Sequence, residues 1–125
     1  MNHRKMISYI RFIFTFQLVF ISLASSQSTI FVFEPNGGED WKVGSQHTIQ
    51  WLTTDGPSRV NIEYSTNGGA NWAFIATNIV SPVNGNAQYN WTIPDEPSQD
   101  CFVKVSDAVD GDPFDTNDAP FTISR

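Results

Sequence analysis

The feature that most constrains the fold of this chain is a repeated alternation of apolar and polar residues, interrupted by turn-forming residues about every ten positions. Successive side chains of a β-strand point to opposite faces, so this alternation predicts short strands that are buried on one side. Clusters of Gly, Pro, Asn and Asp separate the runs, and no segment is convincingly helical. The pattern therefore predicts an all-β, antiparallel sandwich or small barrel of about seven strands.

The alternation also selects which side chains face the interior. Burying them would contribute about 1.5–3 kcal/mol each before the entropy cost, which is enough for a domain of this size. The predicted core residues are Ile30, Val32, Ile49, Trp51, Val60, Ile62, Tyr64, Tyr89, Trp91, Ile93, Cys101, Val103, Val105, Phe121 and Ile123.

The N-terminal segment has the features of a signal peptide. Basic residues precede Phe12–Leu23, an apolar run of about twelve residues, and small residues follow it. A membrane-spanning helix needs about 20 residues. We therefore predict a signal peptide over residues 1–26, cleaved between Ser26 and Gln27, and one secreted domain over residues 27–125. An uncleaved N-terminal anchor is the alternative.

Charge and residue inventory exclude several classes of function for residues 27–125. This part holds all 13 acidic residues but only four of the seven basic ones, which gives a net charge of −9. Nucleic acids and anionic membranes need clusters of Lys and Arg, so neither is an expected partner. His47 is its only histidine and Cys101 its only cysteine, which excludes a zinc site or a His-based triad. Cys101 is expected to be a small buried side chain, with an intermolecular disulfide as the alternative.

The stretch "STNGGANW", residues 65–72, fits the Asp-box pattern S-x-[DN]-x-G-x-x-W of hairpins in sialidases and other secreted β-proteins. Asn-Gly between two alternating runs predicts a tight hairpin. Ser65 and Asn67 are expected to hydrogen-bond the turn backbone, and Trp72 to fold over it. A sialidase would need several such boxes and an arginine cluster, whereas this part has one box and two arginines. The motif therefore predicts a hairpin and no catalysis.

A similar stretch, "PNGGEDW" at 35–41, lies upstream. It follows a proline and precedes a short link, so we interpret it as a turn between strands. The runs around the two motifs do not match, which argues against an internal repeat.

The order of the motifs "PNGGEDWKVGSQHTIQW", "VNIEYSTNGGANW", "YNWTIPDEPSQDCFVKVSD" and "DAPFTI" resembles a known family. It is similar to the Ig-like N-terminal domain of yeast cell-wall β-1,6-glucan synthesis proteins (the KRE/KNH type, or Ser-Thr-rich GPI-anchored membrane family). The resemblance covers about residues 29–124. It implies an Ig-like or fibronectin-III-like β-sandwich module of secreted, cell-surface or cell-wall proteins, without known catalytic residues and usually one part of a longer chain.

Five aspartates between residues 107 and 118 offer hard oxygen ligands, which suit Ca²⁺. The calcium candidates are Asp107, Asp110, Asp112 and Asp115. The spacing is not that of an EF-hand, and the preferred interpretation is a solvated loop whose aspartates cap turns.

Aromatic residues near strand ends are the candidates for ligand contact. Trp41, Trp72 and Phe74 are expected to keep rings exposed, where they would stack on a sugar, with packing on the hairpin or sheet edge as the alternative. Asn90 begins the sequence Asn-Trp-Thr and faces outward by alternation, so it is a candidate for N-glycosylation in a eukaryotic host.

Three further rings, Phe31, Phe33 and Phe102, fall on faces opposite the predicted core. Together they predict an apolar patch that would contact an adjacent domain.

These observations favour a secreted, non-catalytic structural or interaction module, an accessory domain of cell-surface or cell-wall proteins. The acidic residues cluster in turns, and no pair falls on a predicted cleft, which argues against a glycosidase. No cofactor is expected, and the partners are an adjacent domain or a cell-wall polysaccharide. We expect a monomer without membrane insertion after signal cleavage. The alternative function is a carbohydrate-binding module.

Overall fold

The computed structural model describes residues 27–125, and the predicted signal peptide and its cleavage site lie outside these residues. The described residues form β-strands joined by turns and loops, without a helix. The strands are β1 (Thr29–Glu34), β2 (Asp40–Lys42), β3 (Gln46–Thr54), β4 (Arg59–Ser65), β5 (Ala73–Val80), β6 (Gly85–Thr92), β7 (Ser98–Asp107), β8 (Phe114–Thr116) and β9 (Phe121–Ser124).

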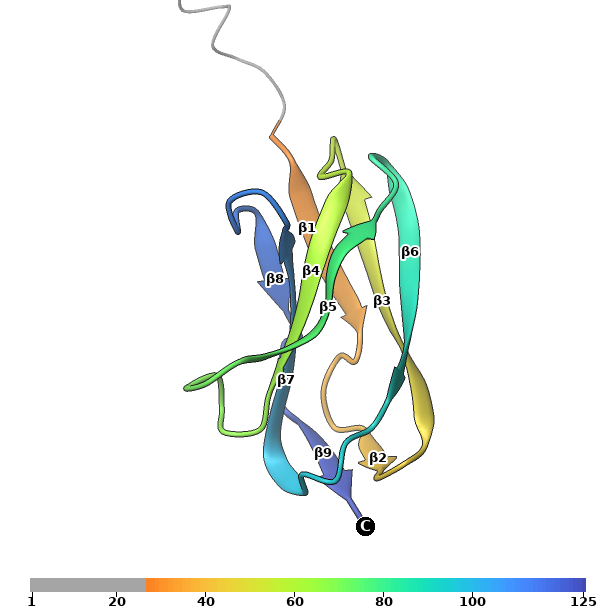
Figure 1. Ribbon diagram of the computed structural model, residues 1–125, viewed down its shortest axis with the longest axis vertical. Helices are drawn as coiled ribbons and strands as arrows, with labels where there is room; N and C mark the ends of the chain where they lie inside the picture. The colour runs from red at the N-terminus through yellow and green to blue at the C-terminus, as the bar shows by residue number, and fades with distance from the viewer. Residues whose placement is uncertain (1–26) are drawn as a thin grey trace, which may run out of the picture.

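The strands form two sheets that pack face to face (Figure 1). One sheet has three antiparallel strands in the order β1-β3-β6. The other has the order β2-β9-β7-β4-β5, with β8 paired to β7, and only its β2–β9 pair is parallel. No strand is shared between the sheets, so they do not close into a barrel. The predicted all-β sandwich is confirmed, with nine strands in the described residues where about seven were predicted.

The structure has two strands that alternation did not predict. β2 and β8 are three residues long, too short for a period of two to be recognised. β2 pairs with β9, and β8 lies inside the aspartate-rich segment, where Asp115 Oδ2 accepts a hydrogen bond of 2.8 Å from the Val32 amide of β1. The interpretation of the segment as a solvated loop is therefore wrong for Phe114–Thr116, which pair with β7 as a strand, and Asp115 there joins the two sheets.

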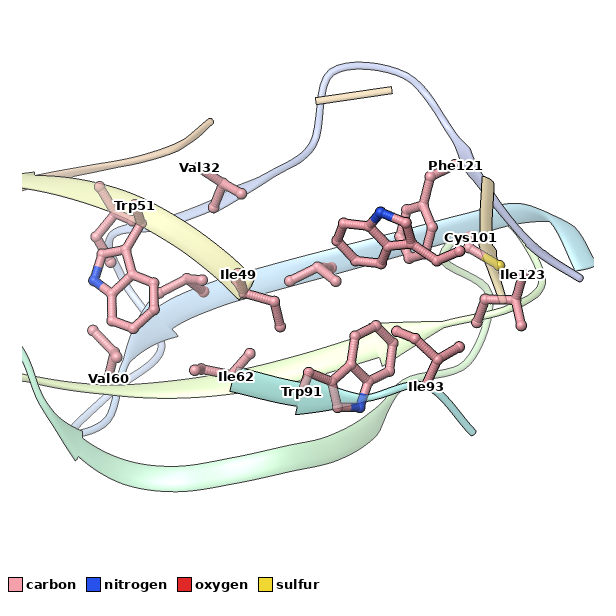
Figure 2. Packing of buried hydrophobic residues seen from close by; sticks show 14 residues of the cluster. Val32, Ile49, Trp51, Val60, Ile62, Trp91, Ile93, Cys101, Phe121 and Ile123 are labelled. Carbon is pink, nitrogen blue, oxygen red and sulfur yellow. The ribbon is translucent and has the colours of Figure 1, made fainter. Parts of the chain in front are cut away.

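The interior between the sheets is continuous, and Figure 2 shows its aromatic and branched side chains meeting from both sides. The buried residues are Ile30, Val32, Trp41, Ile49, Trp51, Val60, Ile62, Trp91, Ile93, Cys101, Val103, Val105, Phe121 and Ile123. The predicted core is confirmed apart from Tyr64 and Tyr89, which are half-buried and pack at its edge. Burial raises the pKa of the Cys101 thiol, so this side chain is an apolar core residue, as expected.

The upstream "NGG" lies in the connection from β1 to β2, which carries the chain from one sheet to the other. The Glu39 carboxylate accepts hydrogen bonds of 2.7 Å from the amides of Asn36 and Gly37. Gly37 has a φ of +134°, and a Cβ there would lie 2.6 Å from the Cβ of Ala119. The motif is a turn between strands, as predicted, and its first glycine is required by close packing.

Candidate functional site

The downstream "NGG" forms the hairpin between β4 and β5, and its polar side chains bond the turn itself. Ser65 Oγ accepts hydrogen bonds from the amides of Asn67 (3.3 Å) and Gly69 (2.9 Å), and it donates one of 2.8 Å to Asn67 Oδ1. Asn67 Oδ1 also accepts one of 2.9 Å from the Asn71 amide. Trp72 packs beside Gly69, where a Cβ would lie 3.4 Å from the indole. The predicted hydrogen bonds of Ser65 and Asn67 within the hairpin are confirmed, but the connection spans residues 66–72 and is longer than the tight turn that Asn-Gly predicts.

The hairpin is fixed to the start of β7. The Gly68 amide donates to the Asp100 carbonyl at 2.9 Å, and Ser98 Oγ donates to the Thr66 carbonyl at 2.6 Å. These bonds place the turn beside the loop that connects β6 to β7. The loop therefore forms the second wall of a pocket next to the hairpin.

This pocket has a volume of about 190 Å³. It combines two aromatic rings with hydroxyl, amide and carboxylate groups. Its lining consists of Tyr64, Ser65, Thr66, Asn67, Asn71, Trp72, Ala73 and Glu96.

Tyr64 connects the pocket to the core. Its ring lies 5.1 Å from that of Trp91, and its hydroxyl donates a hydrogen bond of 3.2 Å to Glu96 Oε1. Burial raises the pKa of the Tyr64 hydroxyl above its ordinary value, and the negative charge of Glu96 adds to the shift. The phenol therefore stays protonated at neutral pH, with its hydroxyl hydrogen directed at Glu96.

A lysine of β7 contacts the tryptophan of the hairpin. Lys104 Nζ lies 4.3 Å from the ring centroid of Trp72, a cation–π geometry, and 3.5 Å from the carboxylate of Glu63. One face of the Trp72 indole is therefore covered by a side chain of the protein.

The three aromatic ligand candidates have different positions. Trp41 is buried at 4% exposure and its ring lies 5.0 Å from Phe121, so the expectation that it stays exposed is wrong. Around Trp41 the sequence shows no alternation and was interpreted as a turn and a short link. In the structure these residues form β2, and its pairing with β9 turns the Trp41 ring inward. Trp72 is half-buried and lines the pocket, while Phe74 is 62% exposed and lies outside it, opposite Glu63 on β4.

The sequence reasoning missed Tyr64 and Glu96 as pocket residues. Alternation assigned Tyr64 to the core, and Glu96 lies in the loop "PDEPSQD", which carried no pattern. The proximity of that loop to an Asp-box hairpin depends on the pairing of β4 with β7, which alternation alone does not specify.

Three of the five aspartates in the segment 107–118, Asp107, Asp110 and Asp115, accept hydrogen bonds from backbone amides. Asp107 Oδ1 accepts from Val109 at 2.8 Å, and Asp110 Oδ1 accepts from Asp112 at 3.1 Å. This agrees with the preferred interpretation of turn capping. Within residues 27–125, no three His, Cys, Asp or Glu side chains are grouped so that they could hold a metal ion, and this includes the calcium candidates Asp107, Asp110, Asp112 and Asp115.

The predicted apolar patch is divided between the two sheets. Phe31 and Phe33 stack on the outer face of the three-stranded sheet, with their ring centroids 6.4 Å apart. Phe102 belongs to β7 of the other sheet. The rings do point outward, but the prediction of one shared patch is wrong because β1 and β7 lie in different layers. Asn90 is exposed on β6, as alternation predicted.

Comparison with known proteins adds no assignment: no protein-family model matches the chain, and a search of curated proteins finds no significant match. In the part of the chain that the structure describes, no helix is long and apolar enough to cross a membrane. The site therefore has to be interpreted from its own geometry.

Proposed function

We propose that this chain is a secreted, non-catalytic Ig-like module that acts as a structural or interaction domain of cell-surface or cell-wall proteins. The observation that carries the proposal is the use of the polar turn residues. Ser65, Asn67, Asp107 and Asp110 all hydrogen-bond nearby backbone amides. Side chains engaged in this way maintain the turns and are not arranged for general acid–base work.

The position of the C-terminal end of the domain supports a role as an accessory module. The chain enters the sandwich through β1 at one end of its long axis, and Arg125 follows β9 at the opposite end (Figure 1). With the signal peptide removed before Gln27, a further domain can be attached only at the Arg125 end, where it would extend the long axis of the sandwich. The motif resemblance to the yeast cell-wall family supports the same role.

A turnover assay tests the non-catalytic part of the proposal. Purified residues 27–125 are incubated with isolated wall polysaccharides, and new reducing ends and polymer mass are followed over days. We expect both to equal those of a buffer control. Release of many reducing ends per protein molecule would overturn the proposal.

Carbohydrate binding is a second candidate, because the pocket beside the hairpin combines rings of Tyr64 and Trp72 with amide and carboxylate groups. Pockets for small ligands share this mixture of apolar walls with a few placed polar groups. Retention of the domain on insoluble wall polysaccharide, compared with a Phe74→Ala variant and an Asn71→Ala variant, separates binding at the pocket from binding at the exposed Phe74 ring. No retention of any form would remove this candidate and leave the spacer role.

A further inference from the structure

We infer that the pocket between the β4–β5 hairpin and the β6–β7 loop binds one sugar unit of a neutral polysaccharide, with Tyr64, Asn71, Trp72 and Glu96 as its contact residues. The inference rests on the second candidate function and specifies its site and its ligand class. It replaces Trp41 and Phe74, which lie outside the pocket, as the residues that would contact a sugar.

The hydrogen-bonding groups of the pocket include both donors and acceptors. The Asn71 side-chain amide, Asn67 Nδ2 and the Thr66 hydroxyl make no hydrogen bond within residues 27–125. Glu96 uses Oε1 for the Tyr64 hydroxyl, and its Oε2 accepts no bond from the described residues. A sugar hydroxyl is at once a donor and an acceptor, so a set of this mixed kind suits a polyhydroxylated ligand.

Charged groups in and beside the pocket bear on the charge of its ligand. The Glu96 carboxylate lies in the lining and would repel an anion. Lys104 Nζ, 4.3 Å from the Trp72 centroid, already occupies the cation position over one face of that ring. The Glu63 carboxylate holds the ammonium there at 3.5 Å. The Glu96 carboxylate therefore disfavours an acidic ligand, and a lysine-rich peptide decides whether it attracts a cation in place of a sugar.

The size of the pocket limits how much of a ligand it can hold. Its 190 Å³ is below the range of about 300–1,000 Å³ that is usual for pockets enclosing a whole small molecule. The pocket can hold one unit, while the rest of a longer ligand would extend along the surface of the domain. Binding through a single unit predicts low affinity for a free monosaccharide. Neighbouring units of an oligosaccharide should raise the affinity.

Nuclear magnetic resonance titration of ¹⁵N-labelled residues 27–125 tests the inference. The probes are glucose, mannose and N-acetylglucosamine, short oligosaccharides of each, and two charged controls, oligogalacturonate and a lysine-rich peptide. We expect saturable shifts with at least one neutral oligosaccharide, centred on the side-chain amide of Asn71, the indole N–H of Trp72 and the backbone of Glu96. The matching monosaccharide should bind more weakly at the same resonances, and neither charged control should shift them.

Variants separate a site from a general surface effect. Asn71→Ala and Tyr64→Phe each remove hydrogen-bonding groups and should weaken binding about three- to tenfold. Phe74→Ala removes an exposed ring outside the pocket and should leave the affinity within about twofold. Thermal unfolding of each variant confirms that it is folded, and the exposed Asn71 position keeps the test open if Tyr64→Phe loses stability.

The possible outcomes distinguish the pocket from the broader function. Shifts centred on Phe74, or equal losses in Phe74→Ala and Asn71→Ala, would overturn the pocket while preserving carbohydrate binding. Shifts with the lysine-rich peptide alone would overturn the ligand class. No saturable shift with any saccharide would overturn both the inference and the carbohydrate candidate, but the non-catalytic role would still be decided by the turnover assay.

Discussion

The upstream "NGG" predicts that two adjacent glycine-to-alanine substitutions lower the free energy of unfolding by very different amounts. Gly37 and Gly38 both have positive φ, +134° and +81°. A Cβ at Gly38 meets nothing within 4 Å, whereas one at Gly37 would lie 2.6 Å from Ala119 Cβ and 3.0 Å from its carbonyl oxygen. Ala119 is held in place because its backbone carbonyl accepts a 2.6 Å hydrogen bond from Nδ2 of the buried Asn117 side chain.

The expected loss of stability has two contributions, backbone strain at a positive φ and overpacking against a neighbour. Backbone strain costs alanine about 1–2 kcal/mol at the left-handed φ of Gly38. At Gly37 we expect backbone strain of about 1–3 kcal/mol, and overpacking against Ala119 adds about 1–3 kcal/mol. Gly37→Ala should therefore destabilise the domain by about 2–6 kcal/mol, a substantial part of the about 5–15 kcal/mol that holds a typical domain folded.

Equilibrium unfolding in urea, followed by tryptophan fluorescence, measures both variants against the parent domain. Trp41 follows this turn closely and is buried, so its emission reports the transition. Gly38→Ala is the matched control. In a separate thermal unfolding experiment, the midpoint temperature should fall by about 4–8 °C for each kcal/mol of stability lost. A free energy of unfolding for Gly37→Ala within about 0.5 kcal/mol of that for Gly38→Ala would refute the close-packing argument.

Three further predictions concern single side chains. Ser65→Ala removes the buried acceptor of the Gly69 amide and should lower the free energy of unfolding in urea by about 1–3 kcal/mol, and a loss below about 0.5 kcal/mol would contradict this. The Cys101 thiol is fully buried with a raised pKa, so a thiol reagent should label it only in denaturant, and rapid labelling of the folded domain would show that it is accessible. The pKa values of Cys101 and Tyr64 are raised on folding, so the folded state holds both protons more tightly. The contribution of these two groups to stability should be constant up to about pH 8.5 and be lost at higher pH, and Tyr64→Phe should reduce the loss above about pH 10. Unfolding in urea at stepped pH measures this, and a rise in stability above pH 9 would contradict it.

The interior of the sandwich was predictable because long strands repeat their pattern. Nine residues from Gln46 to Thr54 show the alternation several times, so Ile49 and Trp51 were assigned to the core correctly. Trp41 was not, because a three-residue strand such as β2 carries no period and is fixed by pairing with β9. Short strands are defined by their tertiary partners.

The candidate site was predictable only in part. The hairpin follows from local turn chemistry, in which Ser65 and Asn67 bond amides two to four residues away. The pocket needs Glu96, which reaches the Tyr64 hydroxyl across 32 positions of sequence. A contact of that separation depends on sheet topology, which local patterns do not specify.

The most direct test of the central claim, that the polar turn residues serve the fold, is amide hydrogen exchange in the folded domain. The amides of Gly69 and Asn71 donate to Ser65 Oγ and Asn67 Oδ1, both at 2.9 Å. We predict that these two turn amides exchange much more slowly than those of an unstructured chain, and that Asn67→Ala abolishes the protection of Asn71. Exchange of both amides at unprotected rates in the folded domain would contradict the account.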